Sequence, residues 1–174
     1  MRLGRLLGIS PTEVIVSLIA TTLVFSPLAY AAASADVTAT VTIASISLTV
    51  TDGSVTYGTI NTSSSTDTTT NGVNDSQTTT NNGNVTEDFD IKAQDSSNWT
   101  LSSTAGSETF AHKFCITDCD TSPTWTALTA SYQALATSVT ESGTQVFDLQ
   151  FLSPTATVVT AEESLTVTVL ASAS

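Results

Sequence analysis

The stretch "AHKFCITDCDTSPTW", residues 111–125, gathers two cysteines four positions apart, the chain's single histidine and two aspartates. It suggests a metal site, a redox pair or a disulfide. Zinc prefers about four Cys or His ligands, more than this stretch supplies. Redox pairs use C-x-x-C spacing beside a helix start, which differs from the spacing here. We therefore predict a disulfide between Cys115 and Cys119, with no metal site and no cofactor.

A disulfide that closes so short a loop stabilises a fold by about 2 kcal/mol. That is enough to pin the tip of a hairpin running from Phe110 to Trp125. Asp118 and Asp120 at the tip have the oxygen chemistry of a weak calcium site. We expect them instead to be solvated loop acids.

Two other sets of side chains have catalytic chemistry. A Ser/His/Asp set would have to use His112, but this residue lies between two phenylalanines, and the chain has no G-x-S-x-G motif. Asp88 and Asp90 would project from one strand face about 7 Å apart. Such a spacing is near that of inverting sugar hydrolases, but Lys92 follows on the same face and favours a solvated surface. We therefore predict a protein that is not an enzyme.

Aromatic residues offer a binding surface rather than catalysis. Trp99, Trp125 and Tyr132 are candidates for a flat platform that binds sugar rings, and the alternative is that they fill the core. Glycosylation is permitted, because four N-x-S/T sequons occur, at Asn61, Asn74, Asn84 and Asn98.

The first 33 residues have the layout of a secretory signal peptide. Arg2 and Arg5 precede the apolar run 14–25, and an Ala-Tyr-Ala site ends at Ala31. The apolar run is shorter than the roughly 20 residues of an ordinary membrane span. We expect cleavage after Ala31 or Ala33 and no membrane segment afterwards, which makes the mature chain secreted, extracellular or attached to the cell surface.

The leader "GISPTEVIVSLIATTLVF" also resembles the processing region of type IV prepilins. That resemblance implies cleavage after Gly8, with Glu13 neutralising the amino terminus of a neighbouring subunit. Pro11 departs from the pattern, and strand-like sequence begins near Val37, whereas bacterial pilin helices continue well past the membrane. Conventional export is therefore the favoured interpretation.

The negative charge of the chain limits the classes of molecule that it can bind. The 16 Asp and Glu outnumber the 4 Lys and Arg, for a net charge of −12, and removing Arg2, Arg5 and Glu13 with the leader takes this to −13. Such a surface repels phosphate backbones and anionic membranes. The sequence therefore predicts no nucleic-acid or membrane partner and leaves cell-surface components, glycans and self-association open.

Alternating Val, Ile and Thr residues predict many short strands. In "DVTATVTIASISLTV" the apolar residues change parity near Ala44, which predicts a bulge or a strand that changes sheet. Residues 61–75 have almost no apolar side chain and predict an exposed polar loop. Residues 125–139 are ambiguous, with a short strand and turn favoured over a helix. Other strands are expected at 54–60, 76–81, 84–93, 98–103, 108–116, 144–152 and 163–171.

These elements predict an all-β fold after an N-terminal signal helix: a single antiparallel β-sandwich, Ig-like or jelly-roll-like, over residues 34–174. The stretches "TNNGNVTEDFDIKAQDSSNWTL", "HKFCITDCDTSPTWTALTASYQALA" and "SGTQVFDLQFLSPT" resemble exported Ser/Thr-rich Ig-like surface proteins of small-genome bacteria. The resemblance implies the fold and the exported location, and it implies no activity.

The sequence therefore favours a secreted or cell-surface structural or adhesive protein. The alternatives are a carbohydrate-binding module and a filament subunit. The filament subunit would be pilin-like or assembled by strand exchange through "SLTVTVLASAS", residues 164–174.

Overall fold

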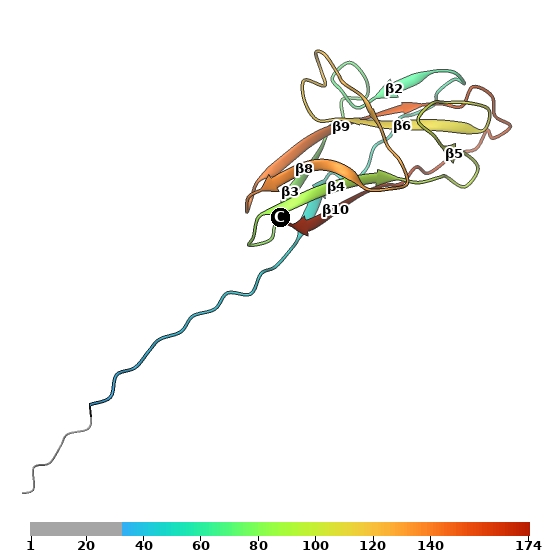
Figure 1. Ribbon diagram of the computed structural model, residues 1–174. Helices are drawn as coiled ribbons and strands as arrows, with labels where there is room; N and C mark the ends of the chain where they lie inside the picture. Colours follow the sequence, from blue (N-terminus) through green and yellow to red (C-terminus); the bar gives the residue numbers. More distant parts are fainter. Residues whose placement is uncertain (1–32) are drawn as a thin grey trace, which may run out of the picture. The chain divides into compact units, whose positions relative to one another are not determined.

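The computed structural model describes residues 33–174 (Figure 1). The expected signal peptide and the prepilin-like cleavage site lie outside the described residues, apart from Ala33. The chain divides after Val41 into two units. In the first, residues 33–41 have no regular secondary structure and all their side chains are exposed. The second, Thr42–Ser174, holds ten β-strands and, as far as the chain is described, no helix, which confirms the all-β prediction.

The strands form two sheets. The larger runs in the order β1-β3-β9-β6-β5, with β2 also beside β9 and β7 beside β6, and the smaller runs β10-β4-β8. The bounds are β1 Leu48–Thr51, β2 Ser65–Asp67, β3 Gln77–Asn81, β4 Glu87–Ala93, β5 Thr100–Leu101, β6 Thr109–Cys115, β7 Thr126–Ala127, β8 Gln133–Val139, β9 Thr144–Leu152 and β10 Val167–Ala173. All the described strand pairs are antiparallel except β5 with β6.

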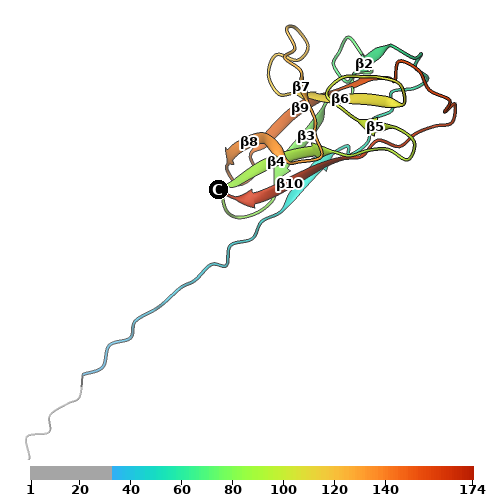
Figure 2. The ribbon, with the colours of Figure 1, turned by 45° about the vertical axis from the view of Figure 1, so that its right-hand side comes forward.

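Apolar side chains from both sheets meet in one core. Phe89 and Ile91 of β4 in the small sheet are fully buried. They belong to one cluster with Phe114 of β6 and with Phe147 and Leu149 of β9 in the large sheet. Figures 1 and 2 show the two layers, with β10, β4 and β8 in one and β9 and β6 in the other.

The predicted alternation in β4 is confirmed. Phe89, Ile91 and Ala93 are buried, while the residues between them are only partly covered. Glu87 has the same parity as Phe89 and is also completely buried. The strand therefore brings one carboxylate into the interior, at the end next to the β3–β4 turn.

The first predicted strand is much shorter in the structure. Only Leu48–Thr51 pairs, because its partner β3 ends opposite Leu48 at Asn81 and the chain then turns. Without a partner strand, Val37, Val41 and Ile43 are 92%, 85% and 77% exposed. The change of apolar parity near Ala44 thus lies just outside the paired strand, and the structure has no bulge or crossing strand there.

Residues 54–75 also differ from the prediction. Residues 54–60 form no strand, although Val55 and Tyr57 do pack against the core. Within the expected exposed loop 61–75, Ser65–Asp67 pairs with β9, and Thr68 and Thr69 are buried. Hydrogen bonds to buried acceptors, described below, replace apolar contacts in ordering this segment.

The remaining differences and agreements concern residues 125–139 and the end of β6. The ambiguous stretch 125–139 forms β7 and β8, as favoured from its composition. The strand predicted at 108–116 ends at Cys115, and Ile116 is 43% exposed. The cause is that the disulfide loop begins directly after Cys115.

Candidate functional site

The predicted disulfide between Cys115 and Cys119 is present, with Cα atoms 5.8 Å apart, an ordinary separation for such a bond. Cys115 is buried at the end of β6, so the bond attaches the following loop to the large sheet. Inside the loop, the Asp118 carbonyl accepts the backbone N–H groups of Thr121 and Ser122. The disulfide and this turn together fix where Asp120 points.

Asp120 docks the disulfide loop onto the segment after β2. Its Oδ1 accepts the backbone N–H of Thr70 at 2.7 Å and the Thr70 hydroxyl at 2.9 Å. The Asp120 carbonyl accepts from the side chain of Asn71 at 3.1 Å. The N–H and then the hydroxyl of Thr70 lower the pKa of Asp120. In Figure 2 the β6–β7 loop projects beside the loop that follows β2. Asp120 is thus a structural contact.

The segment after β2, residues 67–76, folds around buried oxygen atoms. Asp148 on β9 is 4% exposed, and its Oδ1 accepts the hydroxyls of Thr68 at 2.8 Å and Ser76 at 2.7 Å. The Thr68 hydroxyl also accepts the backbone N–H of Leu149. Gly72 is needed in the turn, because a Cβ there would lie 2.0 Å from the carbonyl oxygen of Asp67. Hydrogen bonds to β9 therefore order this polar segment.

Tyr57 and His112 form a buried polar pair nearby, with the Tyr57 hydroxyl 2.8 Å from Nε2 of His112. Burial lowers the pKa of His112 to about 4. Burial, and then the negative charges of Asp67, Asp75 and Asp148, raise the pKa of Tyr57. Both groups are therefore neutral at pH 7. Within residues 33–174, Nδ1 of His112 has no hydrogen-bond partner, so the imidazole has no second group to orient it for proton transfer.

The three residues of the predicted aromatic platform have different surroundings. Trp99 stacks on Phe151 with ring centroids 6.2 Å apart, tilts against Phe110, and donates from Nε1 to the Thr157 hydroxyl. Trp125 is half-buried. Tyr132 is 41% exposed, with the Lys92 ammonium 4.6 Å from its ring centre. Among the aromatic contacts of the described chain, none joins two of these three residues.

Asp88, one of the carboxylates on the outer face of β4, accepts structural hydrogen bonds. Asp88 Oδ1 accepts the Ser138 backbone N–H and the Ser174 hydroxyl, and these bonds, the hydroxyl first, lower its pKa. Two sequon side chains are similarly engaged: Asn98 donates to Glu163, and Asn84 bonds to residues 43–45. Over residues 33–174, no group of three Asp, Glu, His or Cys side chains is arranged to hold a metal ion.

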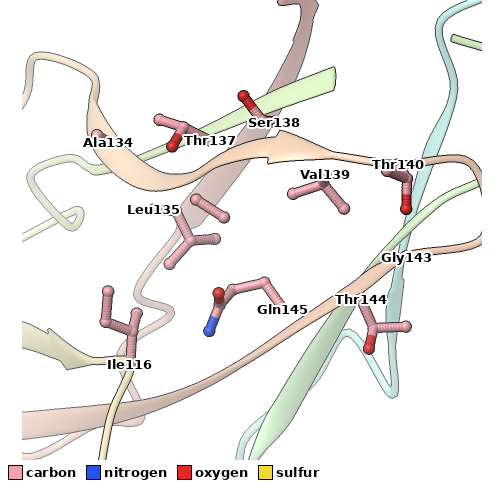
Figure 3. Close-up of a pocket in the computed structure, with 11 residues that line it drawn as sticks. Ile116, Ala134, Leu135, Thr137, Ser138, Val139, Thr140, Gly143, Thr144 and Gln145 are labelled. Atoms are coloured by element: carbon pink, nitrogen blue, oxygen red, sulfur yellow. The ribbon is translucent and has the colours of Figure 1, made fainter. Parts of the chain in front are cut away.

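A groove runs beside β8, the edge strand of the small sheet (Figure 3). It has a volume of about 600 Å³ and is lined by Ile116, residues 134–140 and residues 143–145. A second hollow of about 220 Å³ shares Ile116 and Ala134 with it and reaches Gln133. In Figure 3, Leu135 and Val139 point from β8 toward the space above Gln145. The hollow thus follows β8 along its length, and no charged side chain lines it.

The segment leading into β1 is anchored at one end. The Asn84 side chain accepts the Ser45 N–H at 2.7 Å and donates to the Ile43 carbonyl at 2.9 Å. The buried Glu87 accepts the Ser47 N–H at 2.9 Å. Sequence reasoning missed this role of Glu87, although its parity with Phe89 was a usable signal. Residues 43–47 are therefore held against the β3–β4 turn.

Together, the two sheets, the short disulfide loop and the uncharged groove define a small all-β protein whose polar groups mainly hold its own backbone. No protein-family model, no curated protein and no solved structure matches the chain. In the part of the chain that the structure describes, no helix has the length and apolar character needed to cross a membrane.

Proposed function

We propose that the chain is an exported, non-enzymatic structural or adhesive protein of the cell surface. In this proposal the two sheets form an Ig-like sandwich, or the related jelly-roll arrangement. Two sheets that share one core support the proposal.

The distribution of titratable groups carries the proposal. The groups whose pKa is most changed, Tyr57 and His112, bond to each other in the interior. The groove beside β8 is lined by no carboxylate, imidazole, amine or thiol. Acid–base or nucleophilic catalysis needs such groups within hydrogen-bond reach of a bound substrate. The hollow that could hold a ligand and the reactive groups thus lie apart.

The disulfide supports export, since such bonds persist in oxidising compartments and are rare in the cytosol. Cell fractionation, with mass spectrometry of the amino terminus, tests the location. We expect the chain in the medium or on the surface, starting near Ala32 or Ser34. A start at Ile9 would indicate prepilin processing. A cytosolic chain with two free thiols, or purified protein that hydrolyses a glycan or peptide panel, would contradict the proposal.

A filament subunit is the second candidate, and the exposed apolar residues of 36–43 favour it. Within the C-terminal segment 164–174, Val167–Ala173 form β10, and this strand pairs with β4 along its whole length. Strand exchange through β10 therefore requires it to leave its own sheet, whereas residues 36–43 are exposed already.

The carbohydrate-binding alternative stays a prediction. Trp99 contributes to the packed cluster around Phe151, so Tyr132 is the most exposed of the three candidate residues. A glycan array tests it: binding that is lost in Tyr132→Ala supports a sugar site, and an array without binding removes it.

A further inference from the structure

Residues 36–43, "DVTATVTI", have the pattern of a strand but no strand partner in the described chain. Val37, Ala39, Val41 and Ile43 share one parity, so in an extended chain they point to one side about 7 Å apart. All four are exposed. Alternating apolar residues on an unpaired strand are a template for pairing with another chain.

The free edge of β8 has the complementary features. Among the described strands β8 pairs only with β4, with register shifts on either side of Phe89, so the other edge of β8 has no strand partner. The sequence of β8, "QALATSV", carries no charge and no proline, which natural proteins use to block exposed edges. The groove lies along this edge, with Ile116, Leu135 and Val139 in its lining.

We propose that residues 36–43 of one copy pair with the free edge of β8 in a second copy and place their apolar side chains in the groove. This inference rests on the proposed function of a structural surface protein and names its partner, a second copy of the same chain. Main-chain hydrogen bonds to the edge would supply affinity, and alternate side chains would supply specificity.

Charge favours this pairing over other surfaces. The chain carries a net charge of −12, so copies repel each other over most of their surfaces. Asp36 is the single charged residue in 36–43, and the groove lining has none. The contact between acidic copies therefore includes one carboxylate, that of Asp36 at the end of the donor segment.

The interface joins different surfaces on the two copies. Each copy has one donor segment and one acceptor groove, so such a contact repeats head to tail and gives open chains or rings. This arrangement predicts that two variants, each lacking one surface, combine into a dimer and stop there.

The experiment uses the mature exported chain and four single variants. Val41→Asp disables the donor, and Val158→Asp is its control, since these valines are 85% and 89% exposed. Ile116→Asp disables the acceptor, and Leu170→Asp on β10 is its control, with exposures of 43% and 42%. Light scattering after size exclusion, over a concentration series, gives the assembly state. Circular dichroism and thermal melts verify that each variant folds.

We expect the unaltered chain and both controls to assemble with concentration. Val41→Asp and Ile116→Asp should each raise the concentration needed by about tenfold or more, since a charge would enter an apolar contact. Mixed in equal amounts, these two variants should form a dimer. Undiminished assembly of either variant, or a mixture that stays monomeric, would overturn this interface while leaving the structural proposal standing. An unaltered chain that stays monomeric throughout would also overturn it, and fractionation tests the proposed function separately.

Discussion

Two threonine-rich segments of this protein differ in burial, one lying in the interior and the other exposed to solvent. Residues 67–76, "DTTTNGVNDS", are almost entirely polar, yet Thr68 is 0% and Thr69 is 2% exposed. Residues 36–43, "DVTATVTI", are half apolar, yet Val41 is 85% exposed. The composition of each segment alone would suggest the reverse.

The hydrogen-bond acceptors and strand edges near each segment explain the difference in burial. The polar segment meets Asp148 and Asp120, whose oxygens accept its hydroxyl and amide groups, so its burial leaves few polar atoms unpaired. The apolar segment meets no strand edge, because β3 ends at Asn81. Burial in this fold therefore depends on where acceptors and edges lie, as much as on hydrophobicity.

The largest effect is expected from Asp148→Ala. Thr68 and Ser76 would both lose a hydrogen bond to a buried carboxylate, and the free energy of unfolding should fall by about 4 kcal/mol. Asp36→Ala, in the exposed segment, is the matched control, with a change below about 0.5 kcal/mol. Urea denaturation measures both. Equal effects of the two substitutions would show that the polar segment is not held by Asp148.

Acid should destabilise the fold through His112. Its pKa is about 4 in the folded chain and 6.5 as the ordinary value, so the unfolded chain binds a proton first as pH falls. The stabilisation is therefore complete above pH 6.5 and is lost as pH falls through 4, a change of about 3 kcal/mol. His112→Gln should lack this component in unfolding curves between pH 7 and 4. Parallel curves for the two proteins would contradict the burial of a neutral imidazole.

Removing the disulfide should have a smaller, local effect. The double variant Cys115→Ala with Cys119→Ala should lose about 2 kcal/mol of stability. It should also free the Asp120 loop, so that exchange of the Thr70 backbone amide becomes faster. Hydrogen exchange with mass spectrometry measures this. Unchanged exchange at Thr70 would mean that Asp120 holds its position without the disulfide.

The smallest effect on monomer stability is expected from Val41→Asp. The side chain has almost no contacts to lose, so the melting temperature of dilute protein should stay the same. Val50→Asp in β1, where the valine packs against the core, should cost at least about 2 kcal/mol. If Val41→Asp destabilised the monomer comparably, residues 36–43 would have a partner within their own chain.

Much of the fold could be predicted from sequence, because the alternation in β4 follows directly from burial on one side. The number and spacing of the cysteines were enough to predict the disulfide. The buried polar contacts could not be predicted, since Asp148 meets Thr68 across 80 residues of sequence. The groove also required the fold, because Ile116 and Val139 come together only when the β6–β7 loop and β8 are in place.

Hydrogen exchange of residues 37–43, in the dilute monomer and in the assembled protein, tests the central claim most directly. We expect these amides to exchange freely in the monomer and to become protected on assembly, together with amides on the outer edge of β8. Assembled protein in which residues 37–43 exchange as fast as in the monomer would contradict the account.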